Sequence, residues 1–223
     1  MSSTDNIKVA IKARPLIQRE IVEGLKPVWR IRSNSVYQTD DVGNRFGEIY
    51  TFDHVFDQDC TNTNVYTTVV SSLVESFMEG FNATIFTYGQ TSSGKTHTIL
   101  GSKSEDGLFD LVVKDIFHYV SATTDKKYLI RCSYFEIYNE KINDLLEKSN
   151  QALAIREDTK GNMILNAREA VVTNVAEVKE KMKEGNKVRR IGATGMNERS
   201  SRSHTIFHIS LPGIKTVIFS FIQ

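Results

Sequence analysis

The stretch "YGQTSSGKTHT", Tyr88–Thr98, contains the pattern G-x-x-x-x-G-K-[ST] from Gly89 to Thr96. Each residue type in this pattern suits it to phosphate. Glycines permit backbone angles at which successive amide N–H groups can curl around an anion. Lys95 adds a cation for the β- and γ-phosphates, and the hydroxyl of Thr96 can bind the Mg²⁺ that accompanies them. The sequence therefore predicts a phosphate-binding loop.

The residues on either side of the loop support this prediction. The apolar segment "ATIFTY" (Ala83–Tyr88) precedes it and is rich in aromatic and β-branched residues, which is typical of a buried strand. A helix that begins at Lys95 would add the partial positive charge of its N-terminus at the same place. The alternative is a glycine-rich turn between strand and helix with an accidental lysine.

Composition limits the class of protein and its partners. The chain has 223 residues, 40% of them hydrophobic, which suits one domain with a full core. Charged residues make up 25% and the formal net charge is +1, so no overall field favours nucleic acid or an acidic membrane. Cys60 and Cys132 are isolated in sequence, as in proteins of reducing compartments. The N-terminus lacks the apolar core of a signal peptide, and the run Thr216–Ile222 is too short to span a bilayer. We expect a cytosolic protein without nucleic-acid or membrane partners.

Strands and helices alternate along the chain, which predicts an α/β fold with a mixed central sheet and the phosphate site beyond the carboxyl ends of its strands. The strands are expected at Ile7–Ala13, in short pieces around a Gly43-Asn44 turn, at Ala83–Tyr88, at Lys127–Glu140, within Ala152–Val172 and in "SHTIFHIS". The helices are expected from Asn62 to Gly80, from Lys95, over Gly107–Val120 and over Asn174–Arg190, with a short helical turn at "INDLL".

A second polar motif, "NERSSRSH" (Asn197–His204), is poor core material. The hydroxyls of Ser200, Ser201 and Ser203 can bind Mg²⁺, a γ-phosphate oxygen or a lytic water, which is the inventory that phosphoryl transfer needs. No guanine-reading N-K-x-D occurs in the sequence, so an ATPase is favoured over a GTPase. The alternative is a polar loop whose serines cap a neighbouring helix.

Four motifs together resemble the kinesin motors. "IFTYGQTSSGKTHT" resembles the kinesin phosphate loop, "NERSSRSHTIF" its switch I, "IKARPL" the adenine-side motif R-x-R-P, and "SYFEIYNEKINDLL" the strand before the eighth loop. They occur in the family's order and spacing over residues 6–207. The resemblance implies a P-loop NTPase-type mixed central sheet flanked by helices, and a motor that uses ATP and Mg²⁺ to move along microtubules. Within kinesins, "VWRIRSNSVYQTD" and "LAIREDTKGN" resemble most the centromere-associated CENP-E type.

The resemblance also implies roles for individual residues in binding the nucleotide. Arg14 and Pro15 would stack on the adenine, although Lys12 replaces the family's first arginine and loses planar stacking area. Without the resemblance, Arg14-Pro15 is a turn that ends a strand and His97 is an exposed helix residue. The residues expected around the phosphates and the base are Gly89, Gln90, Thr91, Ser92, Ser93, Gly94, Lys95, Thr96 and His97.

Hydrolysis and microtubule binding would use other residues. Thr96 and Ser201 would be the protein ligands to Mg²⁺. Arg202 would pair with a glutamate of switch II. The residues expected to act in catalysis are Lys95, Asn197, Ser200, Ser201 and Arg202. The cations available for the acidic surface of tubulin are Arg156, Lys160 and Arg168. The alternative is that these three residues are solvated charges in loops without a partner protein. A full-length form would be a homodimer, joined through a coiled-coil stalk. It would be located in the cytoplasm, on the cytoskeleton. The resemblance to the CENP-E type implies a location at the spindle and kinetochore.

The resemblance ends near Phe207, so we expect a partial motor domain over 6–207 and a divergent tail over 208–223. The second switch, D-L-A-G-S-E, is not in the sequence, and the D-x-x-G matches at Asp40–Gly43 and Asp158–Gly161 read as turns. The tail could pair with "TIFHIS" as a hairpin and become the substitute neighbour of the phosphate-loop strand. We expect the chain to be inactive alone. One alternative is a non-catalytic nucleotide-binding protein that regulates a partner, and another is a generic P-loop ATPase with Glu136 as its acidic residue.

Overall fold

The computed structural model describes residues 7–124, 127–147, 152–159, 161, 163–191, 203–211 and 215–222. The chain divides into two compact units, Met1–Val69 and Val70–Gln223. The first unit carries the adenine-side motif, and the second carries the phosphate loop.

The first unit is built from short strands, as the sequence predicts. Strand β1 (Ala10–Lys12) pairs in parallel with β5 (His54–Phe56). A separate antiparallel sheet contains β2 (Trp29–Arg32), β3 (Ser35–Thr39) and β4 (Arg45–Thr51). The turn between β3 and β4 is the expected one, because the carboxylate of Asp40 accepts hydrogen bonds from the backbone N–H groups of Val42 and Asn44. A short helix, α1 (Gln18–Val22), follows β1.

The predicted long helix after Thr61 is present, with one irregular turn. It consists of α2 (Asn62–Val65), a π-helical turn η1 (Tyr66–Val70) and α3 (Ser71–Met78). Thr61 caps its start, since its hydroxyl accepts a bond of 3.1 Å from the backbone N–H of Asn64. An apolar stripe along this helix is buried at Val65, Tyr66, Val69, Val70, Val74 and Phe77.

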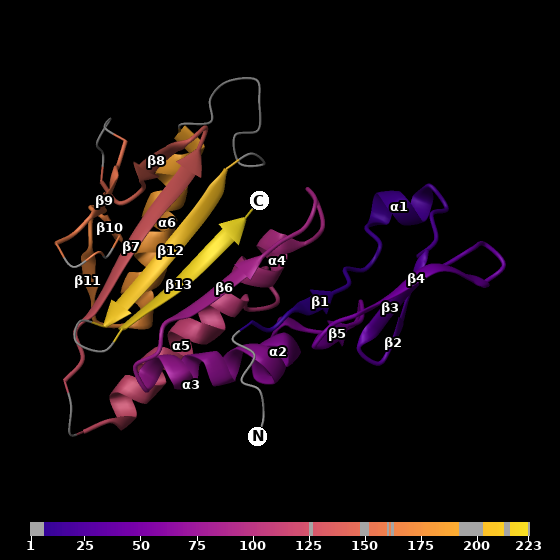
Figure 1. Ribbon diagram of the computed structural model, residues 1–223, viewed down its shortest axis with the longest axis horizontal. Coiled ribbons are helices and arrows are strands. Elements are labelled where there is room, and N and C mark those ends of the chain that lie inside the picture. Colours follow the sequence, from indigo (N-terminus) through magenta and orange to yellow (C-terminus); the bar gives the residue numbers. More distant parts are fainter. Residues whose placement is uncertain are drawn as a thin grey trace. The chain divides into compact units, whose positions relative to one another are not determined.

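A mixed sheet forms the second unit, and its strands run in the order β11-β7-β12-β13-β6 (Figure 1). β6 and β13 are parallel, whereas the other pairs in this order are antiparallel, so the predicted mixed central sheet is confirmed. The bounds of these strands are β6 (Ala83–Thr87), β7 (Ile130–Tyr138), β11 (Ala170–Val172), β12 (His204–Leu211) and β13 (Lys215–Ile222). β9 (Ile155–Glu157) and β10 (Met163–Leu165) form a separate hairpin.

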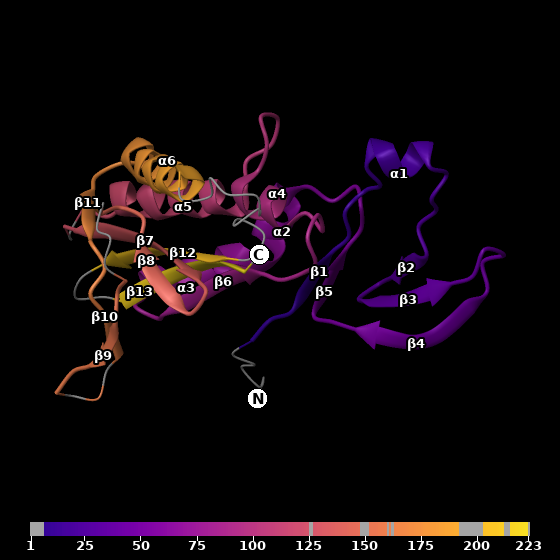
Figure 2. The same cartoon turned by 90° about the horizontal axis from the view of Figure 1, so that it is seen from above.

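Helices α5 (Leu108–Ala122) and α6 (Val175–Ile191) lie on the same face of this sheet (Figure 2). Alternation along β12 buries Thr205, Phe207, Ile209 and Leu211, because successive side chains of a strand point to opposite faces. The ring of Phe207 packs edge-on against that of Phe109 from α5, with 4.9 Å between centroids. A polar residue caps the start of α6, since the side chain of Asn174 accepts a bond from the N–H of Glu177.

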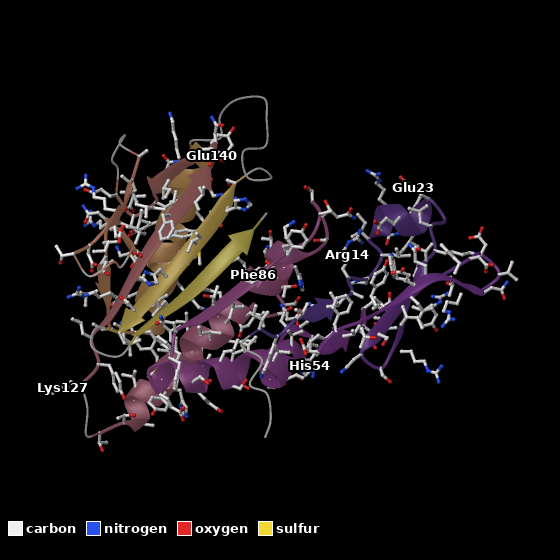
Figure 3. The ribbon with its side chains drawn as sticks, in the orientation of Figure 1. Arg14, Glu23, His54, Phe86, Lys127 and Glu140 are labelled. Atoms are coloured by element: carbon white, nitrogen blue, oxygen red, sulfur yellow. The ribbon has the colours of Figure 1, made fainter. Side chains whose placement is uncertain are left out.

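The helical turn predicted at "INDLL" is wrong. Residues Lys141–Asp144 form strand β8, which pairs antiparallel with the end of β7. Asn139 (φ 49°) and Glu140 (φ 58°, labelled in Figure 3) both adopt left-handed angles. Such a pair makes the tight turn whose twist matches two hydrogen-bonded strands. The apolar pattern of so short a segment does not distinguish a strand from a helix.

The expected hairpin of the tail is present. β13 pairs with β12 from His204↔Ile222 to Leu211↔Lys215, and on its other side it lies parallel to β6, with Phe219 opposite Ile85. The tail therefore supplies the neighbour of the phosphate-loop strand. Within the described residues, none of the helices combines the length and the apolar character needed to cross a membrane.

Candidate functional site

The phosphate-loop motif forms the predicted strand–loop–helix arrangement. β6 ends at Thr87, and α4 (Lys95–Leu100) begins at the predicted residue. Gly94 caps the helix with φ 98°, a left-handed angle that a side chain would disfavour. A β-carbon on Gly89 would lie 2.6 Å from the hydroxyl oxygen of Ser93, so a larger residue there would force the Ser93 side chain to move.

The ammonium of Lys95 lies inside this loop. Its Nζ donates to the carbonyl oxygens of Gly89 (2.7 Å) and Gln90 (2.8 Å). The amide of Ser93 donates to the carbonyl of Gln90 at 3.2 Å, which draws the loop into a curve. Gln90, Thr91 and Ser92 are exposed, so their polar groups are open to a ligand. The loop thus holds a cation between exposed polar residues at the start of a helix, an arrangement that fits the phosphates of a nucleotide.

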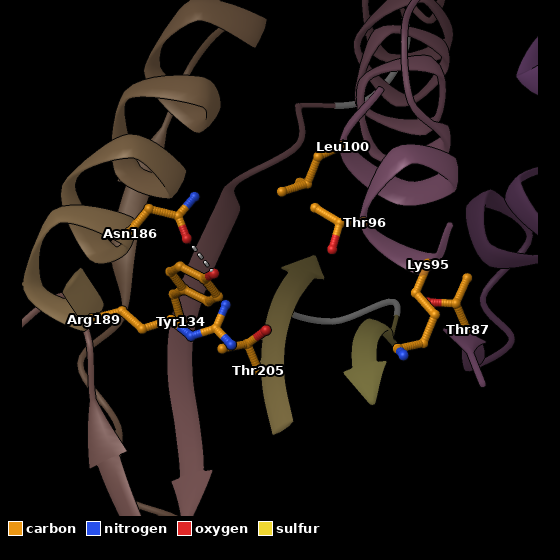
Figure 4. A pocket seen from close by; sticks show the side chains of 8 residues that line it. All are labelled: Thr87, Lys95, Thr96, Leu100, Tyr134, Asn186, Arg189 and Thr205. Carbon is orange, nitrogen blue, oxygen red and sulfur yellow. Dashed lines mark hydrogen bonds between the residues drawn. The ribbon is translucent and has the colours of Figure 1, made fainter. Parts of the chain in front are cut away.

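A small cavity lies between the residues that follow the phosphate loop and α6 (Figure 4). Its volume is about 20 Å³, enough for one water molecule. One side is lined by Thr87, Lys95, Thr96 and Leu100, and the other by Tyr134, Asn186, Arg189 and Thr205. The hydroxyl of Thr87 is buried and has no hydrogen-bond partner among the described residues. The cavity therefore offers hydroxyl groups and two cations beside the predicted ligands of phosphate and Mg²⁺.

A buried ion pair lies at the α6 side of the cavity. Arg189 donates from Nε to Glu136 Oε1 at 3.2 Å and from Nη2 to the hydroxyl of Ser203 at 3.0 Å. The side chain of Glu136 is 1% exposed and that of Arg189 is 13% exposed. Glu136, which one alternative makes the acidic residue of a generic ATPase, is thus already paired with a cation.

Tyr134 and Asn186 close the cavity next to this pair. The phenol of Tyr134 donates to Asn186 Oδ1 at 2.9 Å. Burial raises the pKa of Tyr134 to about 12, so the phenol stays protonated and acts as a hydrogen-bond donor at neutral pH.

His97 and Glu105 approach each other beside α4, with 3.7 Å between His97 Nε2 and Glu105 Oε2. About half of the His97 side chain is exposed. His97, which lies in the helix that follows the phosphate loop, is therefore accessible to a ligand.

In the first unit, Arg14, which is labelled in Figure 3, forms an ion pair with Glu20. Arg14 Nη1 and Nη2 donate to the two oxygens of Glu20 at 2.7 and 2.6 Å, and Glu20 also accepts from the amide of Ile17. These bonds, with that from Arg14 the strongest, lower the pKa of Glu20 to about 2. Lys12 donates to the side chain of Asn62 at 2.7 Å. The two bonds to Glu20 hold the planar guanidinium of Arg14, next to Pro15, in one orientation.

Several predicted site residues lie outside the described residues, namely Asn197, Ser200, Ser201 and Arg202, together with the tubulin-side cation Lys160. Ser203, which follows them in sequence, is described and fully buried. The other two tubulin-side cations, Arg156 on β9 and Arg168, are exposed. The backbone N–H of Arg168 donates to the buried carboxylate of Asp144 at 2.6 Å.

Sequence reasoning missed Arg189, Asn186, Tyr134, Thr205 and Thr87 as neighbours of the phosphate loop. One signal could have found the ion pair. Alternation along β7 places Glu136 on the same face as Cys132 and Tyr134, and a carboxylate on a buried face requires a cation. No pattern in α6, which is rich in charges, singles out Arg189 as that cation.

Comparisons with known proteins agree with this geometry. The family model described as the kinesin motor domain matches residues 12–217. The chain is 40% identical over 211 residues to the kinesin-like protein KIN-7L, chloroplastic, of Arabidopsis thaliana, covering 95% of this chain and 21% of that protein. It is 41% identical over 206 residues to the kinesin-like protein KIN-7I of Oryza sativa subsp. japonica, covering 92% of this chain and 16% of that protein.

A solved structure of a fast kinesin, studied for its ATPase mechanism and interactions with microtubules, has the same fold. Its TM-score is 0.85 at 30% identity, and the match covers 99% of this chain and 66% of the other. The chain spans about a fifth of the length of relatives such as KIN-7L. By the extent of the family match and by these identities, the chain belongs to the kinesin motor domain family.

Proposed function

We propose that this chain is the nucleotide-binding part of an ATP-driven microtubule motor. The observation that carries the proposal is the geometry of the phosphate loop: Lys95 lies within a glycine-closed loop at the start of a helix, and Lys95 and Thr96 both line a cavity shared with α6. ATP with Mg²⁺ fits these residues, because the loop offers amide donors, a cation and a hydroxyl on one side of β6.

In this proposal, Lys95 binds the β- and γ-phosphates and exchanges its bonds to the Gly89 and Gln90 carbonyls for bonds to phosphate oxygens. Thr96 and Ser201 hold Mg²⁺, which supplies positive charge against the charge that develops during phosphoryl transfer. Asn197 and Ser200 orient the attacking water, and Arg202 closes the site through an ion pair. The residues from Gly89 to Gly94 wrap the phosphates.

On the base side, Arg14 and Pro15 stack on the adenine, with His97 beside it. The fork of two hydrogen bonds to Glu20 supports this role, because it keeps the planar guanidinium of Arg14 in one orientation. The partner is a microtubule, for which the exposed Arg156 and Arg168, with Lys160, supply cations.

Finer assignments stay predictions. The centromere-associated subtype is not supported by the relatives named above, which carry KIN-7 names. A spindle or kinetochore location has no support either, and one of those relatives is named as chloroplastic. The homodimer through a stalk, the cytoplasmic location on the cytoskeleton and the division into a partial motor over 6–207 and a tail over 208–223 also stay predictions.

A second candidate function is a non-catalytic nucleotide-binding protein that interacts with or regulates a partner. One observation favours it: β13 lies between β12 and β6, so the phosphate-loop strand β6 is paired with a strand of this chain. Such a sheet can hold the phosphate loop in a shape that binds nucleotide. Nucleotide binding is compatible with the expectation that the chain alone does not hydrolyse ATP.

Binding of a fluorescent ATP analogue with Mg²⁺ tests the proposal. Lys95→Ala should abolish binding, whereas Lys103→Ala, a matched loss of an exposed lysine just beyond α4, should leave it unchanged. Equal binding by the two variants, or none by the unaltered chain, would refute a nucleotide site at this loop. Measurement of ATP turnover with and without microtubules then separates the two candidates, since stimulation by microtubules supports the motor and its absence with intact binding supports the non-catalytic protein.

A further inference from the structure

The loop 101–107 joins α4 to α5 and is closed by its own backbone. The amide of Ser102 donates to the carbonyl of Glu105 at 2.8 Å, and Gly101 forms an antiparallel bridge with Asp106. A β-carbon on Gly101 would lie 2.3 Å from the carbonyl oxygen of Glu105, so only glycine permits this approach of two backbone segments. The conformation of the loop is therefore set by contacts within the loop itself.

This closure places the side chain of Glu105 beside α4. His97 is the third residue of α4, and its Nε2 lies 3.7 Å from Glu105 Oε2. The side chain of Glu105 is 25% exposed and that of His97 is 48% exposed. The residue after Glu105, Asp106, pairs with the ammonium of Lys114 and so ties the loop to α5. The carboxylate that approaches His97 thus comes from a loop that is anchored on both sides.

Stability does not account for the contact between Glu105 and His97. A pair as exposed as this one adds little to the free energy of folding, because water screens both groups. The contact acts instead on the orientation of the imidazole. A neighbouring carboxylate favours the side-chain rotamers that turn Nε2 toward it. A ring that already has one orientation loses less conformational freedom when a ligand packs on it, and the ligand therefore binds more tightly.

We propose that Glu105 is a positioning residue for the nucleotide base: its carboxylate holds the imidazole of His97 in the orientation in which the ring packs against adenine. The inference rests on the proposed function, in which His97 lies beside the base and Lys95 binds the phosphates. Glu105 acts only through His97. Loss of Glu105 should lower the part of ATP affinity that depends on the base and spare the part that depends on the phosphates.

The test compares ATP with inorganic tripolyphosphate, which has the phosphates but neither base nor ribose. With Mg²⁺ present, each displaces a fluorescent ATP analogue that carries its label on the ribose, and the ratio of the two affinities is the gain from the nucleoside. In His97→Ala this gain should fall by about fivefold or more, as when a base loses its stacking partner. In Glu105→Ala it should fall by about threefold, because a ring that is no longer oriented still packs on the base part of the time.

A double variant separates positioning through His97 from any other role of Glu105. If Glu105 acts through His97, adding Glu105→Ala to His97→Ala should lower the gain no further. The matched control is Lys103→Ala, which removes an exposed charge from the same loop and should keep the gain of the unaltered chain. A further fall in the double variant would overturn the inference, as would an unaltered gain in Glu105→Ala.

Failure of the proposed function gives a different result. If the unaltered chain binds neither ATP nor tripolyphosphate, the phosphate site is refuted, and this inference with it. If the chain binds both and the gain survives in His97→Ala, the phosphate site stands, but the base does not pack on His97, and only this inference is overturned.

Discussion

Gly185 of α6 lies directly against the ring of Tyr134 on β7. A β-carbon at Gly185 would be 2.2 Å from Tyr134 Cδ1 and 3.1 Å from Leu145 Cβ. The same ring carries the phenol that donates to Asn186 and lines the cavity next to Lys95. The approach of α6 to the sheet, and with it the place of Arg189, depends on the missing side chain at this position.

Gly185→Ala should therefore destabilise the protein, although replacing glycine by alanine inside a helix normally stabilises it by about 0.5–1 kcal/mol. The added methyl group forces the helix away from Tyr134, and such overpacking costs about 1–3 kcal/mol. Urea unfolding measures the change. Lys183→Ala, at an exposed position of the same helix, should stay within about 0.5 kcal/mol of the unaltered chain. A gain in stability for Gly185→Ala would show that α6 does not pack this closely.

The two cysteines should differ in reactivity. Cys132 is 1% exposed, and burial raises the pKa of its thiol to about 12, so almost no thiolate forms at pH 8. Cys60 is partly exposed. A thiol reagent at pH 8 should label one cysteine per folded chain and both in guanidinium chloride, with peptide mapping identifying Cys60 as the reactive one. Rapid labelling of Cys132 in the folded chain would contradict its placement on the buried face of β7.

Local signals explain what the sequence predicted well. Three adjacent segments were predicted correctly: the apolar run of β6, the glycines of the loop and the helix start at Lys95. The conformation of each segment is determined by residues close to it in sequence. The apolar stripe from Val65 to Phe77 is a similarly strong signal, because its six buried residues are spaced for one face of a helix.

What the sequence could not give depends on contacts between distant residues. "INDLL" became a strand because the turn at Asn139 and Glu140 brings it beside β7, and a turn with two left-handed residues other than glycine carries little signal. The cavity is lined by residues from β6, α4, β7, α6 and β12. The residues on the side away from the phosphate loop could not be predicted, because they come together only when α6 packs on the sheet. Arg189 is one of these residues.

The pair of Arg14 and Glu20 predicts a pH dependence of stability. The bonds from Arg14 and from the amide of Ile17 lower the pKa of Glu20 from its ordinary value of 4.5 to about 2. Between these two values the unfolded chain binds more protons than the folded one, so this group stabilises the fold at pH 5 and loses that contribution as the pH falls toward 2. Glu20→Gln should flatten this part of the profile.

Urea midpoints at pH 5 and pH 3 measure the effect, and the difference between them should be smaller in Glu20→Gln than in the unaltered chain. Glu23→Gln is the matched control, since Glu23 pairs with Arg19 on the same helix at 3.0 Å but both side chains are largely exposed. That variant should keep the difference nearly unchanged, because exposed pairs contribute little. Identical profiles for all three chains would mean that Arg14 is not held by Glu20.

The last prediction concerns the backbone hydrogen bonds of β13. Ser220 lies opposite Ile206 on one side and opposite Phe86 on the other, so the strand is central in its sheet. Proline has no N–H for a sheet bond, and its ring does not fit between two paired strands. Ser220→Pro should therefore leave at least one carbonyl unpaired and cost about 1–3 kcal/mol or more, whereas Ser220→Ala keeps every backbone bond.

Because β6 ends in the phosphate loop, loss of its neighbour should also lower nucleotide affinity in Ser220→Pro relative to Ser220→Ala. Urea unfolding and binding of the fluorescent ATP analogue measure the two effects on the same pair of variants. If the proline and alanine variants unfold at the same urea concentration and bind equally well, β13 does not complete the sheet, and the phosphate-loop strand must find its neighbour elsewhere. A loss of stability together with intact binding would instead show that β6 holds the loop without help from the tail.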